Sequence, residues 1–507
     1  MPLSISLRRA AWLLYYIFLA CLLTANSFGY LDPDFGWHLR VGEQIATTHS
    51  LPSQQLYMWS LGDRTWVDHE WLSNLITFGL WRIGGYLSVS IFFILLPLIG
   101  ILILNRYIFA QYLSAARERI SFAALETLAI FGCLPHFGVR MQEFSFVLII
   151  FLFIIIDAYR RRKNSALALW IIPLLFLWAC LHGSFLIGVA TVIGWLGYEL
   201  FTRDKGNNIK LFIIAIFAIA ATFFTPYGLK LYSFLGDYGS NRYYLSHIEE
   251  WRSPYSHHIR YDQILYSLLT VTLITGAWIF SKKRLPLWQF AIVAALLLAA
   301  SRSVRHFPLF AAGSLLFAAP LALRALFEKN KFQASSSLSF ILTACLLLSS
   351  LGLISQTTIS DQPLRSYCDK YPCGAVQFLK DHPDYRKLKL FNDYGWGGYL
   401  IAALPEQKVF IDGRLPQYPF AGHTMLEEYS DFFKTDNAEK KLSEYGIELV
   451  LFKTKEKPFE PDFFERFVLG EKKQEQINPF IEYLRNSDSW EKIYSDDTAT
   501  LYSLKQL

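Results

Sequence analysis

Apolar runs long enough to cross a lipid bilayer recur along the first 354 residues, and they constrain the fold more than any other feature. A helix needs about 20 predominantly apolar residues to span the hydrocarbon core. The runs predict about eleven transmembrane helices, at residues 11–29, 86–104, 121–137, 143–159, 165–181, 184–201, 210–226, 262–280, 285–301, 305–325 and 335–354. The sequence therefore predicts a polytopic α-helical membrane protein.

Charged residues are concentrated after residue 355, where 45 of the chain's 90 lie, although only 18% of the whole chain is charged and 53% is hydrophobic. Helical patterns occur at 375–382 and 437–445, and strand patterns occur at 387–391, 408–411, 447–452 and 499–504. We therefore predict a transmembrane domain over residues 1–354 and a C-terminal α/β domain over residues 355–507.

Basic residues cluster in short turns between the apolar runs, most clearly at 160–163 and 282–284. Such clusters mark cytoplasmic loops. The bias predicts a multi-pass protein of a bacterial inner membrane with its N-terminus in the cytoplasm. The loop 30–85 and the C-terminal domain would then lie on the outer, periplasmic side. The run 11–29 is long and lacks a small-residue cleavage site, so we expect a retained anchor.

Two cysteines of the C-terminal domain, Cys368 and Cys373, lie five positions apart in "YCDKYPC". An exported domain folds under oxidising conditions, where such a pair favours a disulfide. The other cysteines fall within apolar runs and are expected to be packing residues.

The first outer loop, residues 30–85, is rich in ionisable side chains. Its opening segment "LDPDFGWHLR" carries Asp32, Asp34, His38 and Arg40. A second segment, "WVDHEW" at 66–71, carries Asp68, His69 and Glu70. The flanking tryptophans predict a short helix lying in the membrane interface.

A helix start accounts for part of this pattern. Asp32 would cap the helix, Pro33 would occupy its first position, and Asp34 would favour the positive end of the helix dipole. This interpretation leaves the neighbouring His38 and Arg40 unexplained, so we favour a functional role for Asp32 or Asp34.

Further ionisable residues stand at the outer ends of predicted spans: Arg140, Glu143, His182, Arg302, Arg305 and His306. Single residues of this kind often extend to the membrane interface and do nothing more. Charges gathered at one depth more often face a cavity. Carboxylates and arginines around one outer cavity would suit an anionic ligand attached to a lipid.

The residues above resemble those of the GT-C class of membrane glycosyltransferases, which includes oligosaccharyltransferases and protein mannosyltransferases. These enzymes take a sugar from a polyprenyl-phosphate or polyprenyl-pyrophosphate donor. "LDPDFGWHLR" is similar to the acidic segment after the first transmembrane helix of oligosaccharyltransferase catalytic subunits. The layout of Asp-Pro-Asp, "DHEWL", Gly-Gly-Tyr-Leu and Asp-Gly-Arg is also similar to that of uncharacterised bacterial membrane proteins.

A second similarity lies in the C-terminal domain. "FNDYGWGGYL" at 391–400 and "FIDGR" at 410–414 resemble the Asp-Tyr-Gly segment and the later Asp-Gly of the oligosaccharyltransferase exported domain. Those enzymes carry a Trp-Trp pair before the Asp, which helps to recognise an asparagine acceptor. Phe391 and Asn392 stand here instead, which argues against a peptide asparagine as the acceptor.

The resemblance implies roles for these residues. A base or an orienting carboxylate would come from Asp32, Asp34 and Glu143. The lipid phosphate would be bound by Arg305, Arg140, Arg302 and His306. The acceptor and the sugar would contact His38, Arg40, Asp68, His69, Glu70, His182, Asp393, Asp412 and Arg414.

The resemblance leaves metal dependence open. Oligosaccharyltransferases place acidic metal ligands where Asp34 and Glu143 stand, and such hard ligands suit Mg²⁺ or Mn²⁺. Many relatives with monophosphate donors work without a metal. Because the histidines lack the spacing of a zinc site, we expect them to orient substrates.

The sequence thus predicts a glycosyltransferase that moves a sugar from a lipid-linked donor to a glycan, lipid or protein acceptor at the outer membrane face. Two alternatives are a transporter or flippase for a lipid-linked glycan and a non-catalytic subunit of an envelope glycan assembly complex. Transporters often show repeated halves, which this sequence lacks. It also lacks the basic face of a nucleic-acid-binding protein.

Overall fold

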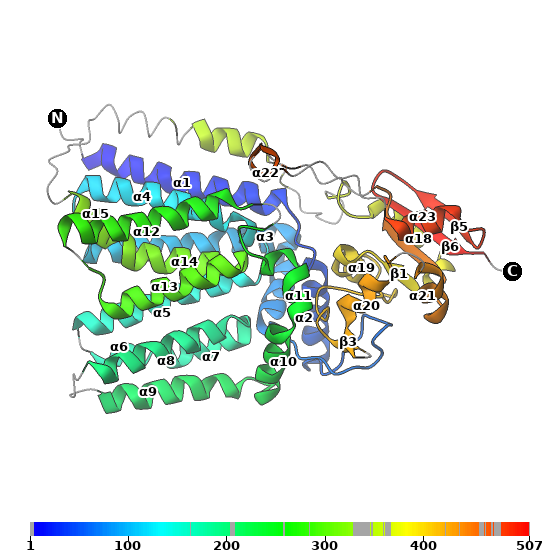
Figure 1. The fold of residues 1–507 in the computed structure, drawn as a ribbon, viewed down its shortest axis with the longest axis horizontal. Helices are drawn as coiled ribbons and strands as arrows, with labels where there is room; N and C mark the ends of the chain where they lie inside the picture. Colours follow the sequence, from blue (N-terminus) through cyan, green and yellow to red (C-terminus); the bar gives the residue numbers. More distant parts are fainter. Residues whose placement is uncertain are drawn as a thin grey trace. The chain divides into compact units, whose positions relative to one another are not determined.

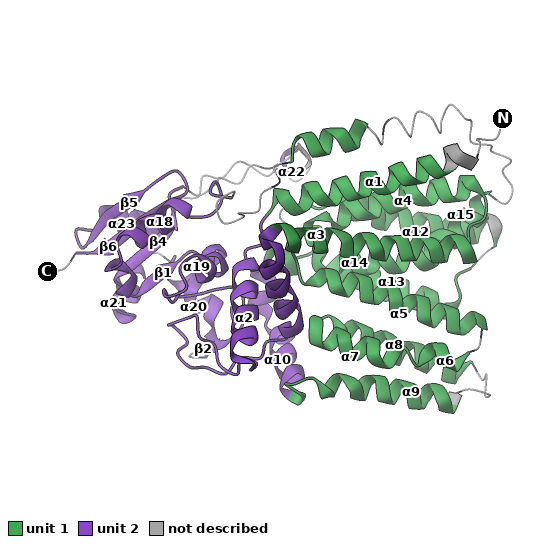
Figure 2. Cartoon of the chain, turned by 180° about the vertical axis from the view of Figure 1, so that it is seen from behind, with its two compact units in different colours: residues 1–30, 87–229, 249–359 green, residues 31–86, 230–248, 360–507 purple. Residues whose placement is uncertain are grey.

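The computed structural model describes residues 5–162, 164–202, 208–256, 259–282, 284–327, 345, 348–357, 359, 367–420, 422–434, 437–455, 461, 463–467, 470 and 478–505. The chain divides into two compact units, each assembled from three stretches of sequence (Figure 2). Unit 1 comprises residues 1–30, 87–229 and 249–359, and unit 2 comprises residues 31–86, 230–248 and 360–507. Most of the first predicted outer loop therefore folds together with the C-terminal part of the chain.

Unit 1 is helical, and its helices lie side by side with their axes roughly parallel (Figure 1). They are α1 (Ile5–Gly29), α4 (Ala116–Cys133), α5 (Gln142–Arg162), α6 (Ser165–Ala168), α7 (Ile171–Leu181), α8 (Phe185–Phe201), α9 (Asn208–Ala221), α12 (Tyr261–Ser281), α13 (Leu287–Arg302), α14 (Phe307–Gly313) and α15 (Ala319–Phe327). Large apolar side chains such as Phe201 and Phe224 are almost fully exposed on its outside, as expected of a surface that faces lipid.

Five helical stretches among the described residues are long and apolar enough to cross a membrane: Arg9–Gly29, Trp71–Gln111, Gln142–Arg162, Tyr261–Ile279 and Val304–Phe327. A sixth candidate is the pair Ile209–Phe224 and Leu229–Ser240, which is bent by 88°. Shorter apolar helices lie at Ser165–Leu181, Phe185–Phe201 and Leu287–Arg302. The chain is thus built as a membrane-embedded helical protein, as predicted.

The predicted count of about eleven spans is not confirmed. The runs from 11–29 to 305–325 coincide with helices, but several of these helices are shorter than a membrane crossing needs. The last predicted run, 335–354, lies mainly outside the described residues.

Helix α3 (Trp71–Gln111) contributes to both units. It is broken at Gly84 and Gly85, where Gly85 has a φ of 61° that favours glycine. Residues before the break belong to unit 2 together with α2 (Phe35–Thr48), α11 (Arg242–His247) and nearly all of α10 (Leu229–Ser240).

The C-terminal part of unit 2 is an α/β fold, as predicted. Its four-stranded sheet has the order β1-β4-β6-β5, with β1 parallel to β4 and the other pairs antiparallel. The strands are β1 (Leu390–Asn392), β4 (Leu449–Lys453), β5 (Trp490–Ser495), β6 (Ala499–Leu504) and the separate hairpin β2 (Pro419–Phe420) and β3 (His423–Thr424). The helices are α18 (Cys373–Asp381), α19 (Gly397–Ala403), α20 (Met425–Asp431), α21 (Ala438–Glu444), α22 (Phe463–Phe467) and α23 (Pro479–Asn486). Cys368 and Cys373 form a disulfide in this unit.

The predicted strand at 408–411 is wrong. Val409 makes only an isolated bridge, with Met58. The side chain of Asn392 takes the place of a neighbouring strand, because its Oδ1 accepts from the amide of Phe410 (2.8 Å) and its Nδ2 donates to the carbonyl of Ile411 (2.9 Å). These backbone groups are therefore satisfied without a sheet.

The predicted interfacial helix at 66–71 is also wrong. Residues 66–70 form an extended segment and a turn, and α3 begins at Trp71. The amide of Trp66 donates to the carbonyl of Ser53 (3.0 Å), and the amide of Glu70 donates to the carboxylate of Asp68 (3.2 Å). Asp68 thus ends the loop and starts the helix.

Candidate active site

Asp34 directly precedes α2, which begins at Phe35 rather than at the predicted Pro33. The carboxylate of Asp32 accepts a hydrogen bond from the amide of Asp34 (2.8 Å), and the amide of Phe35 donates to the carbonyl of Asp32 (3.1 Å). The side chain of Asp34 makes no capping bond to its own helix. Asp32 therefore shapes the start of α2, and the carboxylate of Asp34 is not used for that purpose.

The carboxylate of Asp34 lies instead against the turn at Asp412–Gly413–Arg414. A Cβ atom added to Gly413 would overlap the Asp34 carboxylate, so the two are in close contact. Nearby, the backbone of α2 approaches α19 so tightly that a Cβ on Gly36 would overlap the carbonyl of Gly398. The two resembling motifs, "LDPDFG" and "GWGGY…DGR", thus meet within unit 2.

The turn beside Asp34 is held by a fully buried ion pair. Asp412 accepts from the amide (2.8 Å), Nε (2.9 Å) and Nη2 (2.6 Å) of Arg414, and both side chains are 0% exposed. The guanidinium lies 4.8 Å from the ring centroids of both Tyr57 and Trp66. Asp412 and Arg414 therefore act as a rigid clamp within the fold.

A chain of buried polar side chains continues through the first outer loop. Nδ1 of His38 donates to Oδ1 of Asn74 (2.6 Å), and Nδ2 of Asn74 donates to Asp68 (2.8 and 3.0 Å). Glu70 lies 3.8 Å from Nε2 of His38 and 3.6 Å from Nε2 of His69. Asn74, which no sequence pattern singled out, thus joins His38 to Asp68, and Glu70 lies close to both His38 and His69.

Burial shifts the pKa values of His38 and Asp68, the two side chains that Asn74 joins, in opposite directions. It lowers the pKa of His38 to about 3; nearby His69 lowers this pKa further, and the hydrogen bond that His38 donates to Asn74 opposes the shift. It raises the pKa of Asp68 to about 6, against the hydrogen bonds from Asn74 and Glu70 and the charge of Arg414. Both side chains are therefore uncharged at moderately acid pH.

Because the two pKa shifts are opposite, we predict that the free energy of unfolding depends only weakly on pH. Because the pKa of His38 is lowered in the folded protein, the unfolded chain takes up a proton first as the pH falls below about 6.5. This proton uptake reduces the free energy of unfolding by about 2 kcal/mol at pH 5. The raised pKa of Asp68 has the opposite effect: the free energy of unfolding grows as the pH falls through about 6, by about 1 kcal/mol between pH 7 and pH 5. Asp68→Asn removes only the second contribution, so melting followed by tryptophan fluorescence should show a steeper loss for this variant than for wild type. Equal slopes for both proteins would contradict the burial argument.

The second cluster of predicted residues lies in unit 1 and centres on Glu250, in the 3₁₀ turn Glu249–Trp251. Oε1 of Glu250 accepts from Nη1 of Arg140, and Oε2 accepts from Nη1 of Arg305 (2.9 Å). Burial disfavours the charged form of Glu250, but the two guanidinium groups outweigh this effect and lower its pKa to about 2. Glu250 is therefore a carboxylate at any physiological pH.

The two arginines are supported by neighbours on other helices of unit 1. Nη2 of Arg305 lies 3.4 Å from Nε2 of His182, whose Nδ1 is 2.9 Å from Oγ of Ser145. The guanidinium of Arg305 lies 5.3 Å from the ring of Trp251, and that of Arg140 lies 5.5 Å from the ring of Tyr30. We call Arg140, Glu250, Arg305 and His182 the Glu250 cluster.

Glu143 lies in the first turn of α5, close to Arg140 along the chain. Its Oε1 accepts from the amide of Gly138 (2.6 Å), a residue whose φ of 119° only glycine adopts readily. Its Oε2 is buried and has no hydrogen-bond partner among the described residues. A buried carboxylate oxygen of this kind is able to accept a ligand.

The remaining predicted residues lie elsewhere. Arg302 is exposed at the end of α13, and Arg40 pairs with Glu43 on α2. Asp393 accepts from the amide of Gly395 (3.0 Å) and pairs with Lys453 (3.2 Å), so its side chain has a structural role. The ring of His306 packs 5.8 Å from that of Trp251.

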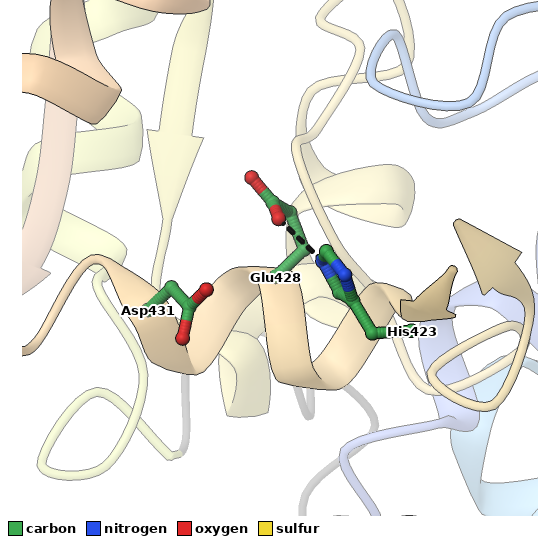
Figure 3. A group of neighbouring side chains, drawn as sticks. All are labelled: His423, Glu428 and Asp431. Atoms are coloured by element: carbon green, nitrogen blue, oxygen red, sulfur yellow. Dashed lines mark hydrogen bonds and ion pairs between the residues drawn. The ribbon is translucent and has the colours of Figure 1, made fainter. Parts of the chain in front are cut away.

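A group of potential metal ligands among the described residues lies outside both clusters. His423, Glu428 and Asp431 are neighbours at α20, with His423 pointing towards Glu428 (Figure 3). Glu428 is already bound by His423 (2.6 Å), by Tyr445 (2.7 Å) and by Lys441, and Asp431 pairs with Lys434. These bonds satisfy the carboxylates, so we interpret the group as an ion-pair network that joins α20 to α21.

The fold of the chain is similar to that of archaeal oligosaccharyltransferases, which have the GT-C fold. One similar structure is the archaeal oligosaccharyltransferase AglB from Archaeoglobus fulgidus in complex with an inhibitory peptide and a dolichol-phosphate, with a TM-score of 0.54 and 11% identity. The similarity covers 89% of this chain and 69% of that one.

Two crystal structures of the Archaeoglobus fulgidus oligosaccharyltransferase are similar as well. The apo form has a TM-score of 0.52 and 12% identity, over 88% of this chain and 69% of that chain. The form tethered by a disulfide to an acceptor peptide with the NVT sequon has a TM-score of 0.54 and 13% identity, over 99% and 74%. No protein-family model and no curated protein sequence match the chain.

Proposed function

We propose that this protein is a glycosyltransferase that moves a sugar from a polyprenyl-phosphate or polyprenyl-pyrophosphate donor to an acceptor outside the cytoplasm. The Glu250 cluster is the observation that carries the proposal, because it presents two arginines at the ends of membrane helices. The same fold occurs in an oligosaccharyltransferase solved with a dolichol-phosphate, which supports a lipid-linked anion as the ligand.

The proposed chemistry needs positive charge at the leaving phosphate. Arg140 and Arg305 supply it through charge-assisted hydrogen bonds, and His182 orients Arg305. Glu250 keeps the two guanidinium groups apart and in place, since it binds one with each carboxylate oxygen. The acceptor also needs a base or an orienting carboxylate, and we assign this role to Asp34.

A divalent cation fits part of the arrangement. Oxygen ligands suit Mg²⁺ or Mn²⁺, and Oε2 of Glu143 is a buried oxygen without a hydrogen-bond partner among the described residues. Glu143 would contribute an oxygen ligand to such an ion, which would neutralise charge on the donor phosphate. The arginines provide the same neutralisation, so the proposal holds for a monophosphate donor without metal.

The acceptor is proposed to be a group other than a peptide asparagine. Phe391 and Asn392 occupy the positions where oligosaccharyltransferases carry acceptor-recognising tryptophans. Phe391 is fully buried between rings that include Phe432 (4.5 Å), and Asn392 is fully buried with its amide bonded to backbone groups. Neither side chain is placed to contact a peptide.

We propose that unit 2 lies on the outer side of a bacterial inner membrane. The disulfide between Cys368 and Cys373 supports an oxidising compartment. The basic clusters at 160–163 and 282–284 support cytoplasmic turns between the apolar runs that flank them.

Incubating the purified protein in lipid nanodiscs with radiolabelled polyprenyl-phosphate sugars tests the proposal. Candidate glycan, lipid and peptide acceptors are supplied separately, and the label is followed by chromatography. A transferase moves label from the lipid to one acceptor class. In proteoliposomes with the same donor, movement of the labelled lipid to the opposite leaflet without transfer to any acceptor would show a transporter and contradict the proposal.

Arg305→Ala should weaken donor binding. A hydrogen bond to a charged group contributes about 1.5–3 kcal/mol, so we expect a 10- to 100-fold increase in the dissociation constant for polyprenyl phosphate. Arg242→Ala, at an exposed arginine of α11, is the matched control and should leave the constant unchanged. Equal binding by both variants would exclude Arg305 as the phosphate ligand.

A further inference from the structure

Gly413 lies where no side chain fits. Of all heavy atoms outside the neighbouring residues, the three nearest to an added Cβ belong to the carboxylate group of Asp34. Gly413 does not have a positive φ, so its backbone would accept alanine without strain. Glycine is therefore needed at position 413 to leave room for the Asp34 carboxylate, and the backbone conformation of the turn does not require it.

The turn itself cannot move away from Asp34. Asp412 and Arg414 on either side of Gly413 are joined by three hydrogen bonds and are fully buried, and Arg414 lies between Tyr57 and Trp66. A buried pair of this kind resists displacement because moving one partner leaves the other charge unpaired. The clamp thus holds Gly413 at a fixed place.

The segment that carries Asp34 is fixed from the other side. A Cβ on Gly398 would overlap the carbonyl of Pro33, and one on Gly36 would overlap the carbonyl of Gly398. These contacts involve backbone atoms on both sides, so α2 and α19 cannot separate or slide without losing their packing.

We infer that Gly413 is a positioning residue for the Asp34 carboxylate. The ion pair between Asp412 and Arg414 keeps Gly413 in contact with this carboxylate. The inference rests on the proposed function, in which Asp34 is the catalytic base or orienting group. A side chain at position 413 would rotate the carboxylate out of place while leaving the backbone intact. A displacement of about 1 Å at a reacting group is enough to lower turnover about 100-fold.

The test compares Gly413→Ala with wild type in nanodiscs, using the labelled polyprenyl-phosphate sugar and its acceptor. We expect the kcat of Gly413→Ala to fall 10- to 100-fold and that of Gly413→Val to fall further, while the KM for the donor stays within twofold. The melting temperature of Gly413→Ala should stay close to wild type, because the displaced atoms are the end of one side chain.

Two glycine variants serve as controls. Gly79 lies in the same unit on α3 and has open space around it, so Gly79→Ala should keep the wild-type kcat. Gly398→Ala meets a backbone carbonyl and should lower the melting temperature, which Gly413→Ala should not do.

The outcomes separate the inference from the proposed function. Full kcat in Gly413→Ala, together with loss of kcat in Asp34→Asn, overturns the inference and leaves the function standing. A rise in KM without a fall in kcat also overturns it. Absence of transfer by the wild-type protein contradicts the proposed function, and the inference fails with it.

Discussion

Replacing Asp34 by Asn is expected to lower the turnover number about 10²- to 10⁴-fold, the range over which positioned bases act. Asn keeps the size of the side chain and its place against Gly413, but it cannot take a proton from an acceptor. Donor affinity should change little, because the arginines of the Glu250 cluster bind the phosphate in our proposal. The measurement is kcat at saturating donor, with the dissociation constant of the donor determined in parallel.

Asp32→Asn is the matched comparison. Its side-chain oxygen can still accept from the amide of Asp34, so the start of α2 is kept. We expect its turnover within a few-fold of wild type. If both variants lose turnover equally, the two aspartates serve only the start of α2. If Asp34→Asn keeps its activity, Asp34 has no part in the mechanism.

Asp412→Asn should destabilise unit 2 by about 3–5 kcal/mol. The substitution leaves the guanidinium of Arg414 buried without its counter-charge, at a side chain that is 0% exposed. For a unit of this size, that corresponds to a fall in melting temperature of about 10 °C. The transition is followed by tryptophan fluorescence, since Trp66 lies 4.8 Å from the guanidinium.

Asp384→Asn applies the same chemical change to an exposed ion pair. Asp384 pairs with Lys387 at the surface, and both side chains are largely exposed, so solvent screens the pair and it contributes little to stability. The melting temperature of this variant should therefore stay near wild type. Similar melting of both variants would show that the clamp does not stabilise the fold.

Much of the architecture could be predicted from the pattern of apolar residues. Runs of about 20 apolar residues have few structural outcomes other than a membrane helix. The strand patterns at 447–452 and 499–504 correspond to β4 and β6. Both strands are almost entirely buried, and a buried strand shows in the sequence as a run of apolar residues. The segment 408–411 carried the same pattern but found its hydrogen bonds on the side chain of Asn392, which no local pattern reveals.

The candidate site was less predictable. The motifs identified Asp34, Arg140 and Arg305 because charges beside apolar runs are conspicuous. Glu250 was missed, although it links both arginines, because a glutamate in a polar loop carries no local signal of its partners. The contact between Gly413 and Asp34 joins positions far apart in the sequence, so no local pattern indicates it.

The cleavage of an isotopically labelled donor tests most directly whether the phosphate bound by the arginines is a leaving group. A polyprenyl-phosphate sugar is prepared with ¹⁸O in the oxygen that bridges the anomeric carbon and phosphorus, and the products are analysed by mass spectrometry. Sugar transfer breaks the bond between the anomeric carbon and this oxygen, so the account predicts that the ¹⁸O remains in the released polyprenyl phosphate. Recovery of the ¹⁸O with the sugar, or an intact donor after incubation with every acceptor class, would contradict it.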